Sequence, residues 1–348
     1  MATITPAPHL HAMTRPLGNA STRSLTGVAI AGVGSFAPAL IVRNEDLGAQ
    51  GYDADWILQR TGIKERRRAP DGMNTSDMGY EAAVRCLEAA ECDPADVDLI
   101  VFATMTPDTP MPSTACHLQA RMGIAAPAFD INAACSGFVY ALVTGAQFVK
   151  SGGARNALVV GADLMSRVLN PADKITFPLF GDGAGAVLLR SGHKKQGLIS
   201  YSLGADGQGA GLLCTPGGGT REPLSAAVLE GNRQYLQMEG KAVFKWAVRK
   251  VSESITQAAL EAGRTPDEMD LLILHQANVR IIDAAIQDLG IDRDKVVINL
   301  DRYGNTSAGS IPLVLDEAQQ AGRIAAGDLV LICGFGAGLT WGSAVIQW

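Results

Sequence analysis

Short, almost continuous apolar runs alternate along this chain with longer stretches in which apolar residues recur at helical spacing. The runs that we expect to be β-strands include ALVVGA (157–162), AVLLRS (186–191), LVLICGF (329–335) and SAVIQW (343–348). The stretches with helical spacing include Thr75 to Ala90, Phe138 to Lys150 and Lys241 to Ala262. Strands that are apolar at nearly every position fit a mostly parallel sheet with helices on both faces. The pattern therefore predicts an α/β fold.

The second part of the chain repeats the pattern of the first at a shift of 172 residues. The shift places DLIVFATMT, which begins at Asp98, over DLLILHQAN, which begins at Asp270. It also places ALVTGAQFVKSGGARNALVVGA over LVLDEAQQAGRIAAGDLVLICG without a gap, and Cys135 over Ser307. A constant register over strand, helix and strand indicates an ancestral duplication. We therefore expect two pseudo-symmetric halves, residues 25–195 and 196–348, behind a disordered tail of residues 1–24.

Charge and cysteine usage exclude several classes of protein. A net charge of −6 over 348 residues argues against a general nucleic-acid binder. No apolar run approaches the roughly 20 residues of a membrane span, and the six cysteines include no C-x-x-C pair. We therefore expect no nucleic-acid or membrane partner, no metal site and no disulfide framework, and we place the protein in the reducing cytoplasm.

Cys135 is the strongest candidate for a reactive residue. It lies in FDINAACSGFVYAL, where a strand is expected to end near Asn132 and a helix to start at about Ser136. Free N–H groups and the positive dipole end at a helix start favour the thiolate, which is the nucleophilic form of cysteine. The structural alternative is a buried thiol without a chemical role.

Two further polar residues are expected at the same edge of the sheet. His275 ends the apolar strand LLILH, and Asn305 stands in the turn-like segment DRYGNTSAGS. Reactive groups in open α/β sheets collect beyond the carboxyl ends of the strands. Cys135, His275 and Asn305 are therefore predicted to meet in one central crevice. Taken singly, His275 also suits a core position, and Asn305 suits a turn or a helix N-cap.

From about Val28 to Trp348 the chain resembles β-ketoacyl-ACP synthase III, the initiating condensing enzyme of fatty-acid synthesis in the thiolase superfamily. The resemblance rests on six motifs in a specific order and spacing: WILQRTGIKERR, AACSGFVYAL, FGDGAGAV, LHQANVRII, RYGNTSAGSIP and GFGAGLTWG. It implies a thiolase-like α/β fold, in which two pseudo-symmetric halves with mostly parallel central sheets form α-β-α-β-α layers. The order Cys…His…Asn resembles this branch rather than the elongating synthases, which have Cys-His-His, or the thiolases.

The resemblance also implies a reaction and a role for each residue. Cys135 would attack an acyl-CoA, and the acyl-enzyme would condense with decarboxylated malonyl-ACP to give a 3-oxoacyl-ACP. His275 and Asn305 would stabilise the enolate left by loss of CO₂, because both can donate hydrogen bonds. The backbone N–H groups of Cys135 and Ala337 would form an oxyanion hole for the acyl carbonyl, and Phe335 would act as a gate. The implied reaction needs no metal and no redox cofactor.

Binding contacts follow from the same resemblance. The CoA site would comprise Trp56, Arg60, Lys174 and Asn278. Lys174 stands where the family usually has an arginine, so it keeps the charge but loses the planar stacking surface. Lys245 and Arg280 would dock the acidic ACP, and Met111 would cross a homodimer interface to close the acyl pocket of the partner.

The sequence leaves other functions open. A condensing enzyme of a specialised polyketide, quinolone or long-chain pathway would use a similar Cys-His-Asn set. A thioester hydrolase and a non-catalytic scaffold with the same fold are more remote, because TGIKERR and GFGAGLTWG have no role in a cysteine hydrolase and a scaffold does not need the three polar residues. The starter acyl group, and whether CoA or ACP carries it, are not specified by the sequence.

Overall fold

The computed structural model describes residues 23–348. Apart from its last two residues, the expected tail of residues 1–24 lies outside this range. The carbonyl oxygen of Arg23 accepts a hydrogen bond from Tyr201 N–H (3.0 Å). No helix in the described range combines the length and the apolar character that crossing a membrane requires.

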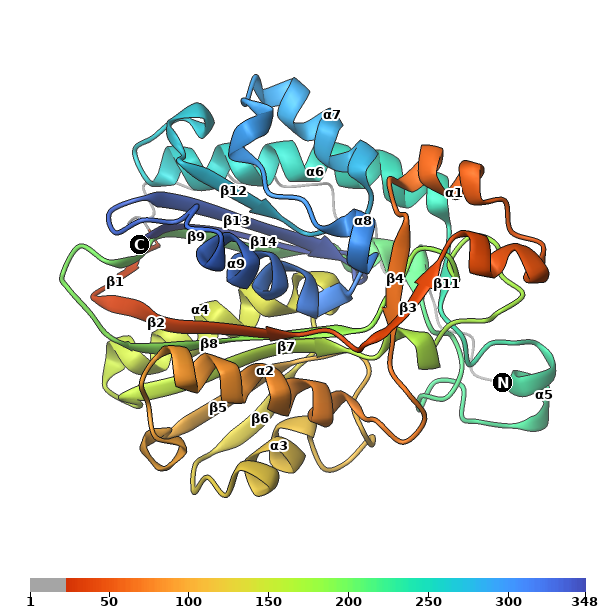
Figure 1. Ribbon diagram of the computed structural model, residues 1–348, viewed down its shortest axis with the longest axis horizontal. Coiled ribbons are helices and arrows are strands. Elements are labelled where there is room, and N and C mark those ends of the chain that lie inside the picture. Colours follow the sequence, from red (N-terminus) through yellow and green to blue (C-terminus); the bar gives the residue numbers. More distant parts are fainter. Residues whose placement is uncertain (1–22) are drawn as a thin grey trace, which may run out of the picture.

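Two five-stranded sheets form the framework of the molecule (Figure 1). The first has the order β2 (Val28–Phe36), β8 (Gly183–Ser191), β7 (Asn156–Asp163), β5 (Leu99–Ala103) and β6 (Ala128–Ile131). The second has the order β1 (Leu25–Thr26), β9 (Gly197–Ala205), β14 (Thr340–Gln347), β13 (Leu329–Gly336) and β12 (Leu271–Leu274). Two small hairpins pair β3 (Leu40–Arg43) with β4 (Glu65–Arg68), and β10 (Leu213–Cys214) with β11 (Gln237–Met238).

Helices lie on both faces of each sheet, which gives five layers (Figure 1). Between the sheets run α4 (Gly137–Ser151) and α9 (Ser310–Gln320), while α2 (Thr75–Ala89) and α3 (Thr114–Met122) cover the first sheet from outside. The outside of the second sheet is covered by α6 (Gly240–Glu261) and α7 (Val279–Leu289). The remaining helices are α1 (Ala54–Thr61), α5 (Ala226–Glu230) and α8 (Leu300–Tyr303). The expected layered α/β fold is confirmed, and the three predicted helices match α2, α4 and α6 to within one residue at each end. The expectation of mostly parallel sheets is wrong, because only β5–β6, β5–β7 and β12–β13 pair in parallel, whereas the other five pairings in the two sheets are antiparallel.

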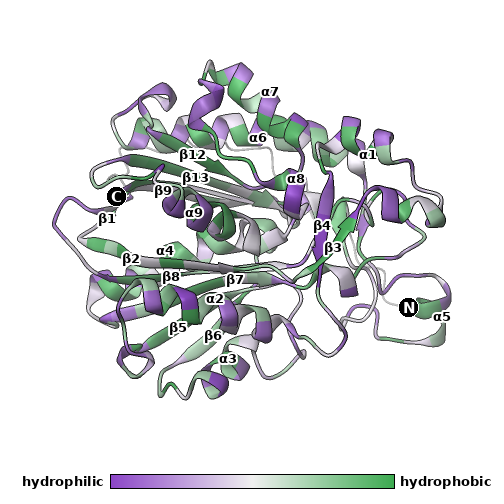
Figure 2. Cartoon of the chain, in the orientation of Figure 1, coloured by the Kyte–Doolittle hydropathy of each residue, from purple (hydrophilic) through white to green (hydrophobic). Residues whose placement is uncertain are grey.

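The strands are buried because both faces of each sheet are covered. Every residue of β5 and of β13 is buried, and Figure 2 shows hydrophobic residues along the central strands, with hydrophilic residues concentrated on the helices and loops around them. One apolar cluster runs from the first sheet through both central helices into the second sheet, and it includes Val101, Leu142, Val314 and Ile332. The two halves of the chain therefore share this central core, and each half also has a buried cluster of its own on the outer side of its sheet.

The pseudo-symmetry is present, but the predicted register is wrong by one residue after the first strand. Leu99 in β5 pairs with Ala157, whereas its counterpart Leu271 in β12 pairs with Val330. The second half has one residue more between these two points, so β7 and β13 correspond at a shift of 173 rather than 172. Among the turn residues, Ala134 (φ 46°) and Ser307 (φ 50°) share the left-handed conformation. The counterpart of Cys135 is therefore Ala308, and not Ser307.

Each half places a short 3₁₀ turn against the sheet of the other half. The turn that holds Cys135 (Ala134–Ser136) lies against β13, and the turn Ser307–Gly309 lies against β7. A Cβ added to Gly161 of β7 would stand 2.4 Å from the carbonyl oxygen of Ala308, and one added to Gly334 of β13 would stand 3.0 Å from Ser136 Cα. Glycine at these two positions is what allows the backbones to approach so closely.

We expect Gly161→Ala to destabilise the protein by about 1–3 kcal/mol, because the new methyl group meets a backbone oxygen that cannot move aside alone. Gly48→Ala is the matched control, since nothing lies within 4 Å of its added Cβ, and it should change the free energy of unfolding by less than about 0.5 kcal/mol. Urea unfolding of both variants measures the difference. An equal effect of the two substitutions would contradict the close packing between the halves.

Candidate active site

Cys135 lies in the 3₁₀ turn between β6 and α4, one residue after the left-handed Ala134. Its side chain is buried, and a Cβ added to Gly336 at the end of β13 would stand 2.8 Å from Cys135 N. The Cys135 thiol lies 3.5 Å from the Ser307 hydroxyl oxygen. The nucleophile predicted from the first half therefore faces the second half on two sides.

Burial decides the protonation state of Cys135 in the ligand-free protein. Desolvation raises the pKa of the thiol to about 12, and hydrogen bonding by Ser307 and Asn305 offsets only part of that effect, while the nearby Asp163 raises it further. In this state burial therefore outweighs the preference for the thiolate that the sequence suggested at the helix start. Burial destabilises the thiolate by removing water from it, and this effect is larger than the stabilisation that the helix start provides.

His275 follows β12 directly, and its backbone N–H donates to Cys333 O (2.8 Å). Its side chain is 1% exposed, and the edge-on ring of Phe335 lies 5.2 Å away between centroids. Burial lowers the pKa of the imidazole to about 3, so the ring is neutral at physiological pH. Within residues 23–348, Nδ1 has no hydrogen-bond partner. A neutral histidine with an uncommitted ring nitrogen is suited to hydrogen bonding with a bound molecule.

Asn305 is fixed by its backbone and by one end of its side chain. Its N–H donates to Leu179 O (2.9 Å), and its carbonyl oxygen accepts from Gly181 N–H (3.0 Å). Its side-chain Oδ1 accepts from Ser307 N–H (2.8 Å). Because the oxygen is engaged, the amide NH₂ is the end that remains for a ligand.

One cavity brings the three predicted residues together. Cys135, His275 and Asn305 all line a space of about 100 Å³. The remainder of its wall is mainly apolar and includes Leu179, Phe180, Leu213, Met238, Val243 and Phe244. A nucleophile and two hydrogen-bond donors in a buried, mainly apolar cavity can form a covalent acyl adduct and stabilise a developing oxyanion.

The four candidate CoA contacts lie on α1, α7 and the loop after β7. Trp56 and Arg60 are exposed on α1. Asn278 is the N-cap of α7, and its side chain donates to Arg60 O (3.1 Å) while it also lines the cavity. Lys174 Nζ donates to Gly51 O (2.9 Å) in the segment before α1. Asn278 thus connects the outer surface at α1 with the cavity.

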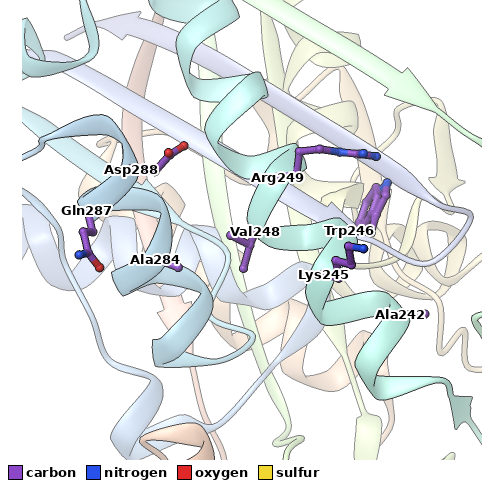
Figure 3. A pocket seen from close by; sticks show the side chains of 8 residues that line it. All are labelled: Ala242, Lys245, Trp246, Val248, Arg249, Ala284, Gln287 and Asp288. Carbon is purple, nitrogen blue, oxygen red and sulfur yellow. The ribbon is translucent and has the colours of Figure 1, made fainter.

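The two candidate docking residues lie on neighbouring helices. Lys245 of α6 lines a groove of about 870 Å³ between α6 and α7, which we call the α6–α7 groove (Figure 3). The guanidinium of Arg280 on α7 stacks 5.3 Å from the ring centre of Phe244 on α6. Trp246 lines both this groove and the cavity of Cys135. A partner seated in the groove would therefore lie beside the reactive residues.

The remaining candidates differ in how closely they approach the cavity. Phe335 lines it, with its ring between those of His275 and Trp246. Ala337 directly follows Gly336, whose backbone approaches Cys135 N. Met111 is 86% exposed and lies before α3, outside the set of residues that line the cavity.

Sequence reasoning missed Asp163, a fully buried carboxylate at the end of β7. It accepts hydrogen bonds from Thr104 Oγ1 (2.9 Å), Met105 N–H (2.8 Å) and Ala308 N–H (3.0 Å). Burial raises the pKa of Asp163, while hydrogen bonds, that from Ser307 first, lower it. The rule that places reactive groups at the carboxyl ends of strands applies to Asp163 as it does to His275, so the signal was present in ALVVGAD.

In the described part of the chain, no three histidine, cysteine, aspartate or glutamate side chains are grouped as a metal ion would require.

Comparisons with known proteins show the family to which the chain belongs. Residues 129–207 match the family model of 3-oxoacyl-[acyl-carrier-protein] synthase III, and residues 260–348 match the model of its C-terminal part. The chain is 55% identical to β-ketoacyl-[acyl-carrier-protein] synthase III of Rhodopirellula baltica, in a match that covers 93% of this chain and 99% of the relative. It is 50% identical to the protein of that name from Caldanaerobacter subterraneus, covering 92% of this chain and 97% of the relative.

Solved structures give the same result. The β-ketoacyl-[acyl carrier protein] synthase III of Thermus thermophilus superposes with a TM-score of 0.87 at 42% identity, covering 92% of this chain and 99% of the other. The priming β-ketosynthase of the R1128 polyketide biosynthetic pathway superposes with a TM-score of 0.85 at 34% identity, covering 92% and 96%. On identity over nearly the full length of its relatives, the chain belongs to the β-ketoacyl-[acyl-carrier-protein] synthase III family.

Proposed function

We propose that this protein condenses an acyl-CoA with malonyl-ACP, releasing CO₂ and CoA and forming a 3-oxoacyl-ACP. The observation that carries the proposal is the meeting of Cys135, His275 and Asn305 in one apolar cavity, in a chain of this family. A nucleophile alone would suit many acyl transfers. The two additional neutral donors suit a reaction in which negative charge develops on a thioester oxygen.

In the first half-reaction, Cys135 attacks the thioester carbon of the acyl-CoA. A new C–S bond forms, the bond to the CoA sulfur breaks, and the proton lost by the Cys135 thiol balances the one gained by the CoA thiol. The backbone N–H groups of Cys135 and Ala337 are the donors for the transient oxyanion, because Ala337 follows the strand end that approaches Cys135 N. The apolar wall then holds the acyl chain.

In the second half-reaction, the C–C bond to the malonyl carboxylate breaks and CO₂ leaves. The electron pair becomes an enolate on the thioester of the carrier protein, and His275 and the Asn305 NH₂ donate to its oxygen. The enolate carbon attacks the acyl group, the C–S bond to Cys135 breaks, and the departing thiolate takes up one proton from solution, which is the proton that the overall reaction consumes. Because His275 is neutral, neither donor forms an ion pair with the carboxylate of the substrate, so the interaction strengthens as the charge moves to the enolate.

Replacing His275 or Asn305 with alanine should therefore separate the two half-reactions. We expect either variant to be acylated at Cys135 at close to the normal rate. Decarboxylation of malonyl-ACP should fall by about 10²–10³-fold, the usual effect of removing one oxyanion donor. Intact-protein mass spectrometry measures acylation, and CO₂ release measures decarboxylation. Decarboxylation at the wild-type rate in either variant would refute the assigned role.

The burial of Cys135 predicts how its reactivity depends on pH in the ligand-free enzyme. With a thiol pKa of about 12, the fraction present as thiolate rises about tenfold for each pH unit below that value. The rate of alkylation of Cys135 by iodoacetamide, followed by peptide mass spectrometry, should therefore rise about tenfold per unit between about pH 6 and pH 9. A rate that levels off below about pH 8 would show that a thiolate is already present.

The α6–α7 groove is the site that we assign to the carrier protein. Lys245 and Arg249 of α6 line it, and Arg280 lies on the facing helix. Figure 3 shows Lys245 and Arg249 on one side and Gln287 and Asp288 on the other. An acidic partner would be attracted mainly by α6 and by the start of α7, because Asp288 repels it at the far end.

Lys245→Glu and Arg280→Glu should each raise the KM for malonyl-ACP by roughly tenfold at low salt, and less at high salt because the attraction is screened. Neither should change the acylation of Cys135 by an acyl-CoA by more than a small factor. Lys194→Glu is the matched control, since Lys194 is exposed in the turn between β8 and β9. Steady-state kinetics at two salt concentrations measure the effect, and an equal KM for all three variants would place the docking surface elsewhere.

The homodimer, the cytoplasmic location and the CoA donor belong to the same proposal. Met111 supports a dimer, because a methionine that is 86% exposed on one chain presents an apolar surface that a second copy could cover. Trp56 and Arg60 support the CoA donor, because an exposed indole beside a cation can hold a nucleotide.

A further inference from the structure

Arg66 is a fully buried cation without a carboxylate partner. It lies in β4, its exposure is 0%, and within residues 23–348 no aspartate or glutamate oxygen comes within the 4.0 Å of an ion pair. Burying an unpaired guanidinium is costly. Burial lowers the pKa of Arg66 to about 10, which still leaves it charged at neutral pH. A charge retained at this cost calls for an explanation beyond filling the core.

The contacts of Arg66 join two parts of the chain. Its Nη1 donates to Val42 O (3.1 Å), and its Nη2 donates to Asn44 Oδ1 (2.7 Å) and to Pro178 O (2.8 Å). The first two acceptors belong to the β3–β4 hairpin and the residue after β3, whereas Pro178 belongs to the loop before β8. The guanidinium thus connects the hairpin to residues 177–181, which we call the clamp segment.

The clamp segment is the same segment that holds Asn305. Leu179, next to Pro178, accepts the hydrogen bond from Asn305 N–H, and Gly181 donates to Asn305 O. Leu179 and Phe180 also line the cavity of Cys135. Arg66 is therefore one residue away from the backbone contact that fixes a donor of the active site.

The geometry leaves little freedom at this point. A Cβ added to Gly304, the residue before Asn305, would stand 2.9 Å from Leu179 O and 3.3 Å from Arg66 Cβ. Arg68, two residues along β4, donates from Nη2 to Phe177 O (3.1 Å) at the start of the clamp segment. A planar guanidinium can reach several carbonyl groups at fixed angles, which a single ammonium cannot.

We propose that Arg66 is a positioning residue for Asn305, which acts by holding the clamp segment through the carbonyl group of Pro178. Asn305 is thereby placed to within the tolerance that enolate stabilisation requires, since displacements of about 1 Å reduce catalysis strongly. The proposal deepens the proposed function and rests on it for the role of Asn305. Cys135 lies on a different turn and does not depend on the clamp segment for its backbone position.

The test is Arg66→Met compared with Arg43→Met. Arg43 lies on the same hairpin, is exposed, and contacts Glu65 at 3.9 Å, so its loss controls for effects on the hairpin. We expect R66M to lower decarboxylation of malonyl-ACP by roughly 10- to 100-fold and to leave acylation of Cys135 within about twofold of the wild-type rate. Arg66→Lys should recover part of the loss, and R43M should change neither rate.

A double-mutant cycle separates positioning from general support of the fold. If Arg66 acts through Asn305, R66M should have little further effect on decarboxylation in an Asn305→Ala background. An equal fall in both half-reactions, or effects of R66M and N305A that multiply, would overturn the proposal.

Amide hydrogen exchange gives a readout that does not depend on the reaction. R66M, but not R43M, should speed exchange at the amides of Asn305 and Gly181, whose acceptors lie in or against the clamp segment. Unchanged exchange at both amides would also overturn the proposal. A wild-type protein that decarboxylates no malonyl-ACP would instead refute the proposed function, and the exchange rates would then decide the structural claim alone.

Discussion

The close contact between each short turn and the sheet of the opposite half is the constraint on which the rest of the structure depends. Gly161 and Gly334 leave no side chain between these backbones. The first contact brings Ala308 N–H to Asp163 (3.0 Å), and the second brings the Cys135 turn to the end of β13. Without both, the nucleophile of the first half would not face His275 and Asn305 of the second.

The same contact buries the reactive side chains, and burial sets their chemistry. Burial keeps the thiol of Cys135 protonated and the ring of His275 neutral. Neutral donors in a low-dielectric cavity interact weakly with an uncharged thioester and strongly with an enolate. The arrangement therefore stabilises the enolate that forms during the reaction more than it stabilises the carboxylate of the malonyl substrate.

The sequence predicted the parts of the structure that depend on local patterns. Almost wholly apolar runs located the buried strands β7 and β13, and the positions of Cys135, His275 and Asn305 after strands or in turns predicted their meeting. The register between the halves was missed because a single extra residue before Ser307 leaves the apolar rhythm intact. The protonation state of Cys135 was missed because desolvation depends on β13, which lies almost 200 residues further along the chain.

The roles of Arg66 and Asp163 could not be predicted from the sequence for a different reason. Each hydrogen bonds to groups far away in sequence, and their partners are mostly backbone atoms. Backbone acceptors and donors are the same at every position, so no pattern of side chains indicates which of them a buried charge will meet.

The packing of each turn against the sheet of the other half has a consequence for the newly synthesised chain. β13 (Leu329–Gly336) and β14 (Thr340–Gln347) lie almost 200 residues after Cys135, so they are synthesised well after it. Until these strands join the second sheet, the Cys135 thiol is not buried against β13 and does not share a cavity with His275 and Asn305. Packing of β13 against the Cys135 turn is therefore the step that converts an ordinary cysteine into a member of an assembled site.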